Sequence, residues 1–205
     1  MNVPGAVFSA IRQRRSIRRY KPDPVSVELV LRLVEAACWA PSAGNRQDWS
    51  FTVVSSLTVK SAMAEAVRRR WNAVGAANRD SGLIEDVLAY SAGFGDFERA
   101  PAVVVVSARQ PDSFQRHILG DDAGATLGSA TSAAMAAQNF MLAAHEMGLG
   151  TCCMTGALAA RQEMGQAIGL PRKQEVVCLI SLGWPDERPE APPRKPAGEV
   201  VRFIE

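Results

Sequence analysis

The chain has 205 residues, a length that fits one domain or at most two and allows a sizeable core without disulfides or metals. Hydrophobic residues make up 47% and charged residues 21%, which is the balance of an ordinary globular protein. The formal net charge of +2 is too small to indicate a general affinity for nucleic acid or for an anionic membrane.

Cysteine usage argues against a metal site and against secretion. There is no C-x-x-C spacing and there are only two histidines, too few ligands for structural zinc. The vicinal Cys152–Cys153 pair is interpreted as packing, because no partner that would lower its pKa is evident. We expect all four cysteines to be small buried hydrophobes in a reducing compartment: Cys38, Cys152, Cys153 and Cys178. The N-terminus lacks a signal-peptide pattern and the apolar runs are too short to span a bilayer, so the sequence predicts a cytoplasmic protein.

Hydrophobic periodicity and turn residues predict helices and strands along one domain, 1–205. The predicted elements, in chain order, are a helix over 7–13, a helix from the N-cap Ser26 to about 38, a strand over 49–54, a helix over 61–70, a strand over 102–107, a long helix from a cap at Asp121 or Asp122 to a C-cap at Gly148, a helix over 159–168 and a strand over 176–182.

Two stretches lack a clear helix or strand pattern. Residues 71–98 are poorly patterned and are expected to form a mobile excursion, while the proline-rich tail 184–205 is expected to run extended without helix. The long helix is rich in Ala, Gly and Ser, which lets helices approach closely but buries little area per residue. It therefore suits a crowded centre, either of the domain or of a subunit interface.

The most basic stretch is Arg14–Tyr20, with the sequence RRSIRRY. Guanidinium groups bind phosphate oxygens through paired hydrogen bonds, and a serine hydroxyl adds another. In an extended chain Arg14, Ser16 and Arg18 lie on one side. The stretch therefore fits either a phosphate site or a solvated basic arm that binds nucleic acid.

Three further segments offer polar groups but are individually weak signals. Residues 40–49 (APSAGNRQDW) suit the edge of a heterocycle, although a loop between a helix and a strand explains them equally well. Residues 148–156 (GLGTCCMTG) fail the G-x-G-x-x-G test, because Cys153 replaces the third glycine and the segment follows a helix. Residues 192–196 (PPRKP) hold two cations in a stiff segment that either reaches a distant anion or lies in solvent.

Taken together and in order, these segments resemble the nitroreductase family over nearly the whole chain. The residues that carry the resemblance are RRSIRRY (14–20), APSAGNRQDW (40–49), AAQNFMLAAHEMGLGTCCMTG (136–156), IGLP (168–171), SLGWP (181–185) and PPRKP (192–196). The resemblance implies an α+β fold with a central, mostly antiparallel sheet flanked by helices, in an intertwined homodimer that binds FMN between its subunits. It also implies that NADH or NADPH reduces the flavin, which then reduces a small organic acceptor, such as a nitroaromatic or a quinone, in a ping-pong cycle.

The resemblance further implies which residues bind the flavin, with no side-chain nucleophile and no metal. Segment 14–18 meets the phosphate, the ribityl chain and the N1/O2 edge, with Arg15 contributing mainly backbone. Loop 41–45 packs on the isoalloxazine from the other subunit, amides 155–156 meet the N5/O4 edge, and the arginine of the tail returns to the phosphate. The implied residues are Arg14, Arg15, Ser16, Arg18, Pro41, Ser42, Ala43, Asn45, Thr155, Gly156 and Arg194.

The chain departs from the family pattern at two positions, and other readings stay open. Asp48 replaces a proline and Cys153 replaces a common aromatic residue, and both changes affect the shape of the pocket. A dehydrogenase or dehalogenase with the same FMN is the nearest alternative, and a non-enzymatic protein that binds nucleic acid through its basic arm is a distant one. The near-neutral net charge argues against the latter. The aromatic residues within 71–98 are expected to form part of the substrate entrance: Trp71, Tyr90, Phe94 and Phe97.

Overall fold

The computed structural model of the chain describes residues 5–77, 79–119 and 123–204. In this part of the chain the centre is a four-stranded antiparallel sheet with the strand order β1-β2-β4-β3. The strands are β1 (Trp49–Val54), β2 (Ala102–Arg109), β3 (Gly150–Met154) and β4 (Gln174–Gly183). The predicted α+β class with an antiparallel central sheet is therefore confirmed.

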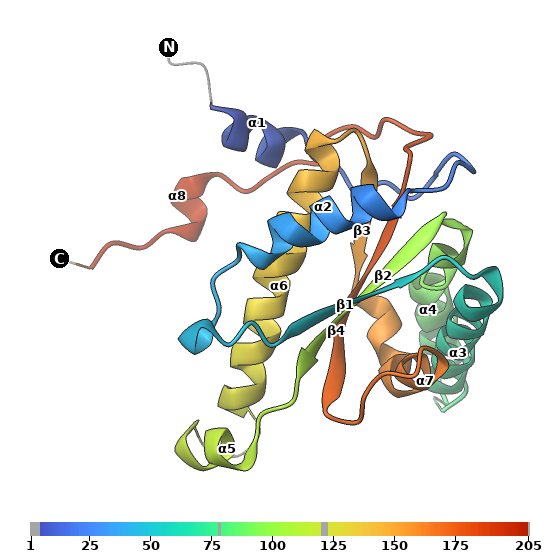
Figure 1. Ribbon diagram of the computed structural model, residues 1–205. Helices are drawn as coiled ribbons and strands as arrows, with labels where there is room; N and C mark the ends of the chain where they lie inside the picture. The colour runs from blue at the N-terminus through green and yellow to red at the C-terminus, as the bar shows by residue number, and fades with distance from the viewer. Residues whose placement is uncertain (1–4, 78, 120–122, 205) are drawn as a thin grey trace.

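Helices cover both faces of this sheet (Figure 1). One face packs against α2 (Val27–Cys38) and α6 (Ala123–Glu146), and the other packs against α3 (Leu57–Ala76) and α7 (Arg161–Ala167). The remaining helices and 3-10 turns are α1 (Ala6–Gln13), α4 (Ser81–Ser91), α5 (Ser113–Leu119), α8 (Ala197–Val200), η1 (Ala43–Asn45), η2 (Asp96–Arg99) and η3 (Gly156–Ala160).

Strand burial follows from alternation along the central strand β2. Val104 and Val106 belong to the core beneath α6, whereas Val103 and Val105 belong to the core beneath α3, and all four are fully buried. The small residues of α6, such as Ala133 and Ala136, are also fully buried in the first core. This part of α6 thus serves the centre of the domain, one of the two places that the sequence left open.

Local end signals of two helices were predicted correctly. Ser26 caps α2, because its hydroxyl oxygen accepts a hydrogen bond from the amide of Leu29. Gly148 takes a left-handed φ of 77° just after α6 and donates its amide to His145, while Leu149 donates to Ala144 at 2.8 Å. These two bonds form a Schellman motif, which satisfies the last carbonyls of the helix.

The basic segment 14–20 is fixed along the edge of the sheet. Ser16 forms a parallel bridge with Thr151 of β3, and the amide of Ile17 donates to the Thr151 carbonyl at 2.9 Å. The Tyr20 hydroxyl donates to the Ile17 carbonyl and shares a 2.7 Å hydrogen bond with the hydroxyl of Ser181. The sheet therefore holds the arginines of this segment in an extended, defined conformation.

The described residues of 71–98, which the sequence predicts to form a mobile excursion, are largely helical. They complete α3, form all of α4 and enter η2. Gly75 lies inside α3 where a Cβ would be 3.5 Å from Leu88 of α4, so the glycine belongs to a helix contact and does not end the helix. Asp80 caps α4 by accepting hydrogen bonds from the amides of Gly82 and Leu83. Packing between the two helices thus overrides weak local propensity.

The structure differs from the sequence predictions at several other points, and one prediction lies outside the described residues. Segment 150–154 forms β3, which was not predicted, and α5 was not predicted either. The tail contains one helical turn, α8, because Pro196 stands at its N-cap, where a missing amide hydrogen bond costs nothing. Cys38 and Cys153 are exposed, so not all four cysteines are buried. The proposed caps Asp121 and Asp122 lie outside the described residues.

Within the described residues, no helix combines the length and apolar character needed to cross a membrane.

Candidate functional site

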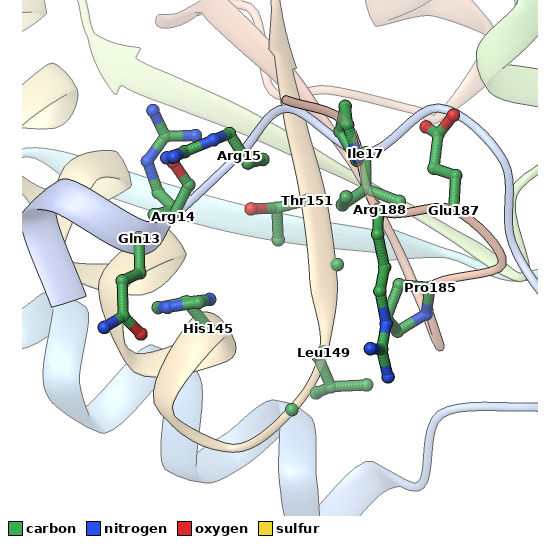
Figure 2. Close-up of a pocket in the computed structure, with 13 residues that line it drawn as sticks. Gln13, Arg14, Arg15, Ile17, His145, Leu149, Thr151, Pro185, Glu187 and Arg188 are labelled. Atoms are coloured by element: carbon green, nitrogen blue, oxygen red, sulfur yellow. The ribbon is translucent and has the colours of Figure 1, made fainter. Parts of the chain in front are cut away.

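A cavity of about 500 Å³, here named the Arg14 cavity, lies where α1, the end of α6 and β3 meet. Figure 2 shows Gln13, Arg14 and Arg15 on one side of it, with Thr151 between them and Ile17. The residues that line it are Gln13, Arg14, Arg15, Ile17, His145, Gly148, Leu149, Gly150, Thr151, Pro185, Glu187, Arg188 and Pro189. Three arginines against one glutamate make its surface suitable for an anion.

The side chain of Arg15 carries an unsatisfied donor in this cavity. Its Nη1 donates to the carbonyls of Arg12 at 2.6 Å and Arg14 at 2.9 Å, while its Nε is buried without a hydrogen-bond partner among the described residues. A buried donor without an acceptor costs about 1–3 kcal/mol, which an anionic ligand would remove. The sequence assigned Arg15 mainly a backbone contribution, and its side-chain donor was not singled out.

Arg14, Ser16 and Arg18 all lie close enough to Cys152 of β3 to affect the pKa of its thiol. Burial raises the pKa of that thiol, while the charge of Arg18, a hydrogen bond from Ser16 and the charge of Arg14 lower it. A phosphate prefers such a combination of guanidinium and hydroxyl donors. The three residues therefore lie around one thiol, and their donor types are those that a phosphorylated ligand would need.

A larger cavity of about 720 Å³, here named the Thr155 cavity, lies beside the end of β3. Thr155 and Gly156 stand where β3 ends and η3 begins, and the first amides of a helical turn have no partner within the turn. The residues that line this cavity are Arg18, Arg19, Tyr20, Tyr90, Gly93, Phe94, Asp96, Phe97, Arg99, Cys152, Cys153, Met154, Thr155, Gly156, Ser181 and Asp186. Arg18 and the amides at 155–156 therefore border one space.

Three of the four aromatic residues that the sequence predicts at a substrate entrance line this cavity. Tyr90, Phe94 and Phe97 line it, and Trp71 packs behind them with ring centroids 5.9 Å from Tyr90 and 5.3 Å from Phe94. The Trp71 indole N–H donates to the Gly156 carbonyl at 3.0 Å. Phe97 is only 2% exposed and belongs to the core, so Tyr90, at 69% exposed, is the residue best placed to touch a substrate.

The sequence analysis did not identify several charged and polar groups at the Thr155 cavity and the adjoining Arg14 cavity. Arg99 and Asp96 enter it from η2 and form a loose ion pair of 3.9 Å. Tyr20 reaches it from the basic segment, and burial strongly raises the pKa of its hydroxyl. Glu187 anchors the same segment from behind, because its Oε1 accepts hydrogen bonds from the amides of Arg18 and Arg19. Tyr20 belonged to a motif already noted, but no local pattern marked the other three.

The remaining predicted residues lie elsewhere in the chain. Pro41, Ser42 and Ala43 line a third cavity of about 430 Å³ against α6, and the Asn45 side chain accepts a hydrogen bond from Gln47 at 3.1 Å. Arg194 is exposed and donates to the carbonyls of its own neighbours, Pro192 and Pro193. Within one chain, neither the 41–45 loop nor Arg194 is brought to the Arg14 or Thr155 cavity.

Asp48, one of the two departures from the family pattern, forms an ion pair with Arg46. The Arg46 Nε lies 3.0 Å from the Asp48 carboxylate, and the Asp48 carbonyl accepts a hydrogen bond from the amide of Arg109 at 2.9 Å. The Arg46–Asp48 ion pair therefore restrains the loop after Pro41. A proline at position 48, as in the family pattern, would restrain the loop through its fixed φ angle instead.

Comparisons with known proteins find relatives that match nearly the whole chain in sequence or fold. A curated relative, an NADH dehydrogenase of Thermus thermophilus, is 32% identical over 205 residues that cover 94% of this chain and 93% of the relative. The solved structure of a BluB-like flavoprotein from Clostridium difficile superposes with a TM-score of 0.82 at 22% identity and covers 97% of this chain and 99% of that one. An NADPH:FMN oxidoreductase from Vibrio harveyi in complex with NAD+ superposes with a TM-score of 0.73 at 24% identity, and the match covers 98% of this chain and 78% of that one. The family model described as "Nitroreductase family" matches residues 11–184, so the chain belongs to the nitroreductase family.

Proposed function

We propose that this protein is an FMN-dependent oxidoreductase that takes hydride from NADH or NADPH and reduces a small organic acceptor. One observation carries the proposal: the basic segment 14–20 runs along β3 from the cationic Arg14 cavity, which Arg14 lines, to the Thr155 cavity, which Arg18 lines. The names of the relatives support it, since they include an NADH dehydrogenase and an NADPH:FMN oxidoreductase.

The residues present fit FMN. Arg14 and Ser16 would hold the terminal phosphate. The Nε of Arg15 nearby is a further hydrogen-bond donor without a partner among the described residues. Arg18 would face the ribityl chain and the N1/O2 edge, and the amides of Thr155 and Gly156 would donate to the N5/O4 edge. The bound flavin supplies hydride transfer, first from the nicotinamide and then to the acceptor in the same space.

The chain's own part in this chemistry is electrostatic and steric. With FMN bound, the Arg18 guanidinium would supply positive charge near a reduced ring, and such preorganised charge acts strongly in a site that excludes water. Tyr90 and Phe94 form an aromatic wall beside Gly156, which shields the space from solvent and suits a planar acceptor. No side-chain nucleophile is required.

The experiment compares Arg14→Ala with Arg12→Ala, a matched control from the same basic run. Each charge-assisted contact is worth about 1.5–3 kcal/mol, so Arg14→Ala should weaken FMN binding about tenfold or more, while Arg12→Ala should leave it near wild type. Mass spectrometry of the released cofactor should show FMN. Release of FAD, a protein without flavin, or equal losses in the two variants would overturn the proposal.

We further propose a homodimer in which both chains build each flavin site. The Pro41 loop and Arg194 lie apart from the other predicted ligands within one chain, as a two-chain site requires. Large apolar side chains are also exposed next to these segments, among them Trp39 at 83% and Phe203 at 82%. Exposed apolar surface of this kind is characteristic of an interface.

Sedimentation of the apo and FMN-loaded protein over a dilution series tests the dimer. A ligand that binds only the dimer must stabilise it, so FMN should shift dissociation to lower protein concentration. Removing the tail from Pro192 onward should weaken the dimer and FMN binding together. A monomer that keeps stoichiometric FMN on dilution would show that one chain suffices.

A further inference from the structure

Strand β3 separates the adjacent cysteines onto opposite sides. Cys152 pairs with Ser181 and is buried, and this burial raises the pKa of its thiol. Cys153 pairs with Ile180 and is exposed. Because successive side chains in a strand alternate between faces, the vicinal cysteines are not partners of each other.

The sheet instead gives Cys153 a different partner on its own face. Cys178 lies two residues before Ile180 on β4, so it stands diagonally across from Cys153 on the same face, where a hydrogen-bonding interaction between the two thiols affects the pKa of both. This interaction, together with the charge of Arg14, lowers the pKa of Cys153 to about 7, against the opposing effect of burial, and the same interaction raises the pKa of Cys178. One sulfur thus has thiolate character while its neighbour holds a proton.

The sheet is irregular next to both cysteines. The pairing of β4 with β2 shifts in register beside Cys178, because Val106 pairs with Cys178 whereas the next residue, Ser107, pairs with Val176. Such a bulge bends a strand and increases its twist, and bulges are frequent next to active sites. Strand β3 is an edge strand that ends one residue after Cys153. Diagonal neighbours lie somewhat too far apart for an unstrained disulfide, so this local irregularity matters.

We propose that Cys153 and Cys178 form a redox-active dithiol, which a hydroperoxide converts into a reversible disulfide within one chain. The Cys153 thiolate attacks the terminal hydroxyl oxygen of the hydroperoxide: a sulfur–oxygen bond forms, the oxygen–oxygen bond breaks and the other oxygen leaves as hydroxide or alkoxide, so that Cys153 is oxidised to a sulfenic acid. The Cys178 sulfur then attacks the Cys153 sulfur. The disulfide forms, the sulfur–oxygen bond breaks, and the hydroxyl leaves as water with the thiol proton of Cys178.

The position of the pair gives the disulfide a consequence. Cys153 is among the residues of the Thr155 cavity and stands two residues before Thr155, so a disulfide at this point would change β3 next to the proposed flavin site. A bond drawn across a strand diagonal is strained, and strained disulfides are the easily reduced ones. The pair is therefore suited to a reversible change and not to a permanent structural bond. The chemistry of the dithiol does not depend on the proposed oxidoreductase activity.

The experiment treats the protein, as purified with its cofactor, with limiting hydrogen peroxide, blocks free thiols by alkylation and maps the tryptic peptides. Two of the four thiols should be lost. Peptides 117–161 and 174–194 should become covalently linked, and a dithiol reductant should separate them. Cys153→Ala and Cys178→Ala should each abolish the link, whereas Cys152→Ala and Cys38→Ala should retain it.

Each alternative product decides against the proposal. A bond between Cys152 and Cys153, a link through Cys38 between chains, or Cys153 oxidised to a sulfinic acid beside a free Cys178 would overturn it. Because Cys178 is buried, Cys178→Ala could lower stability, and the Cys153→Ala variant then tests the link independently at an exposed position.

Discussion

The contact between Gly156 and Phe94 joins the proposed flavin edge to the aromatic wall, and Gly156→Ala tests it. A Cβ at this position would lie 2.6, 2.6 and 2.7 Å from three ring carbons of Phe94. Ordinary contacts between carbon atoms are about 3.5–4.0 Å, so the ring would have to move by about 1 Å. Gly156 is not among the glycines with a left-handed φ, so the cost is steric.

The ring has little space for this movement. Trp71 and Tyr90 pack on Phe94 edge to face, with ring centroids at 5.3 and 5.1 Å, and Trp71 is itself hydrogen-bonded to the Gly156 carbonyl. Overpacking a site of this kind costs about 1–3 kcal/mol. We therefore expect Gly156→Ala to lower the free energy of unfolding by that amount, measured by urea denaturation with tryptophan fluorescence.

Two comparisons isolate the steric cause. In a Phe94→Leu background, the cost of Gly156→Ala should fall by about 1 kcal/mol or more, because the clashing ring is gone. Gly165→Ala is the matched control: its Cβ would meet Leu170 at an ordinary 3.5 Å inside α7, so this change should be neutral or stabilising by up to about 1 kcal/mol. An equal cost of Gly156→Ala with and without the Phe94 ring would refute the reasoning.

Three further predictions follow from single side chains. The pKa of Glu187 is lowered chiefly by hydrogen bonds from backbone amides of the basic segment. The ionised carboxylate therefore stabilises the folded protein above the ordinary glutamate pKa of about 4.3, and this contribution is lost as pH falls through the lower pKa of the folded state. We expect Glu187→Gln to reduce the loss of unfolding free energy between about pH 5 and pH 3. Leu33 is fully buried between α2 and α6, so Leu33→Ala should cost about 2–5 kcal/mol in denaturant unfolding, whereas the same change at Leu31, which is 62% exposed, should cost under about 0.5 kcal/mol. Tyr90→Ala should change the KM for acceptors in steady-state assays while FMN stays bound, and unchanged kinetics would remove α4 from the substrate entrance.

Much of the secondary structure could be predicted because its signals are local. The hydroxyl of Ser26 caps α2 from within the same turn, and Gly148 ends α6 through its own φ. The strands β1, β2 and β4 are marked by short apolar runs between turn residues. Strand β3 carried no such mark, because its five residues, GTCCM, are a short mixture of small and polar types whose pairing is determined by β4. The helical state of 71–98 was equally hidden, since α3 and α4 stabilise each other.

The sequence by itself determined which functional groups the protein has and which family it resembles. It showed the alternating Arg14, Ser16 and Arg18, the order of the family segments, and the aromatic residues before β2. Only the tertiary structure decided which groups meet, because contacts between distant segments depend on strand register and helix packing and not on spacing along the chain. Register places Cys153 beside Cys178 and away from its neighbour Cys152. Packing likewise brings Phe94 onto Gly156, which no local pattern in either segment could indicate.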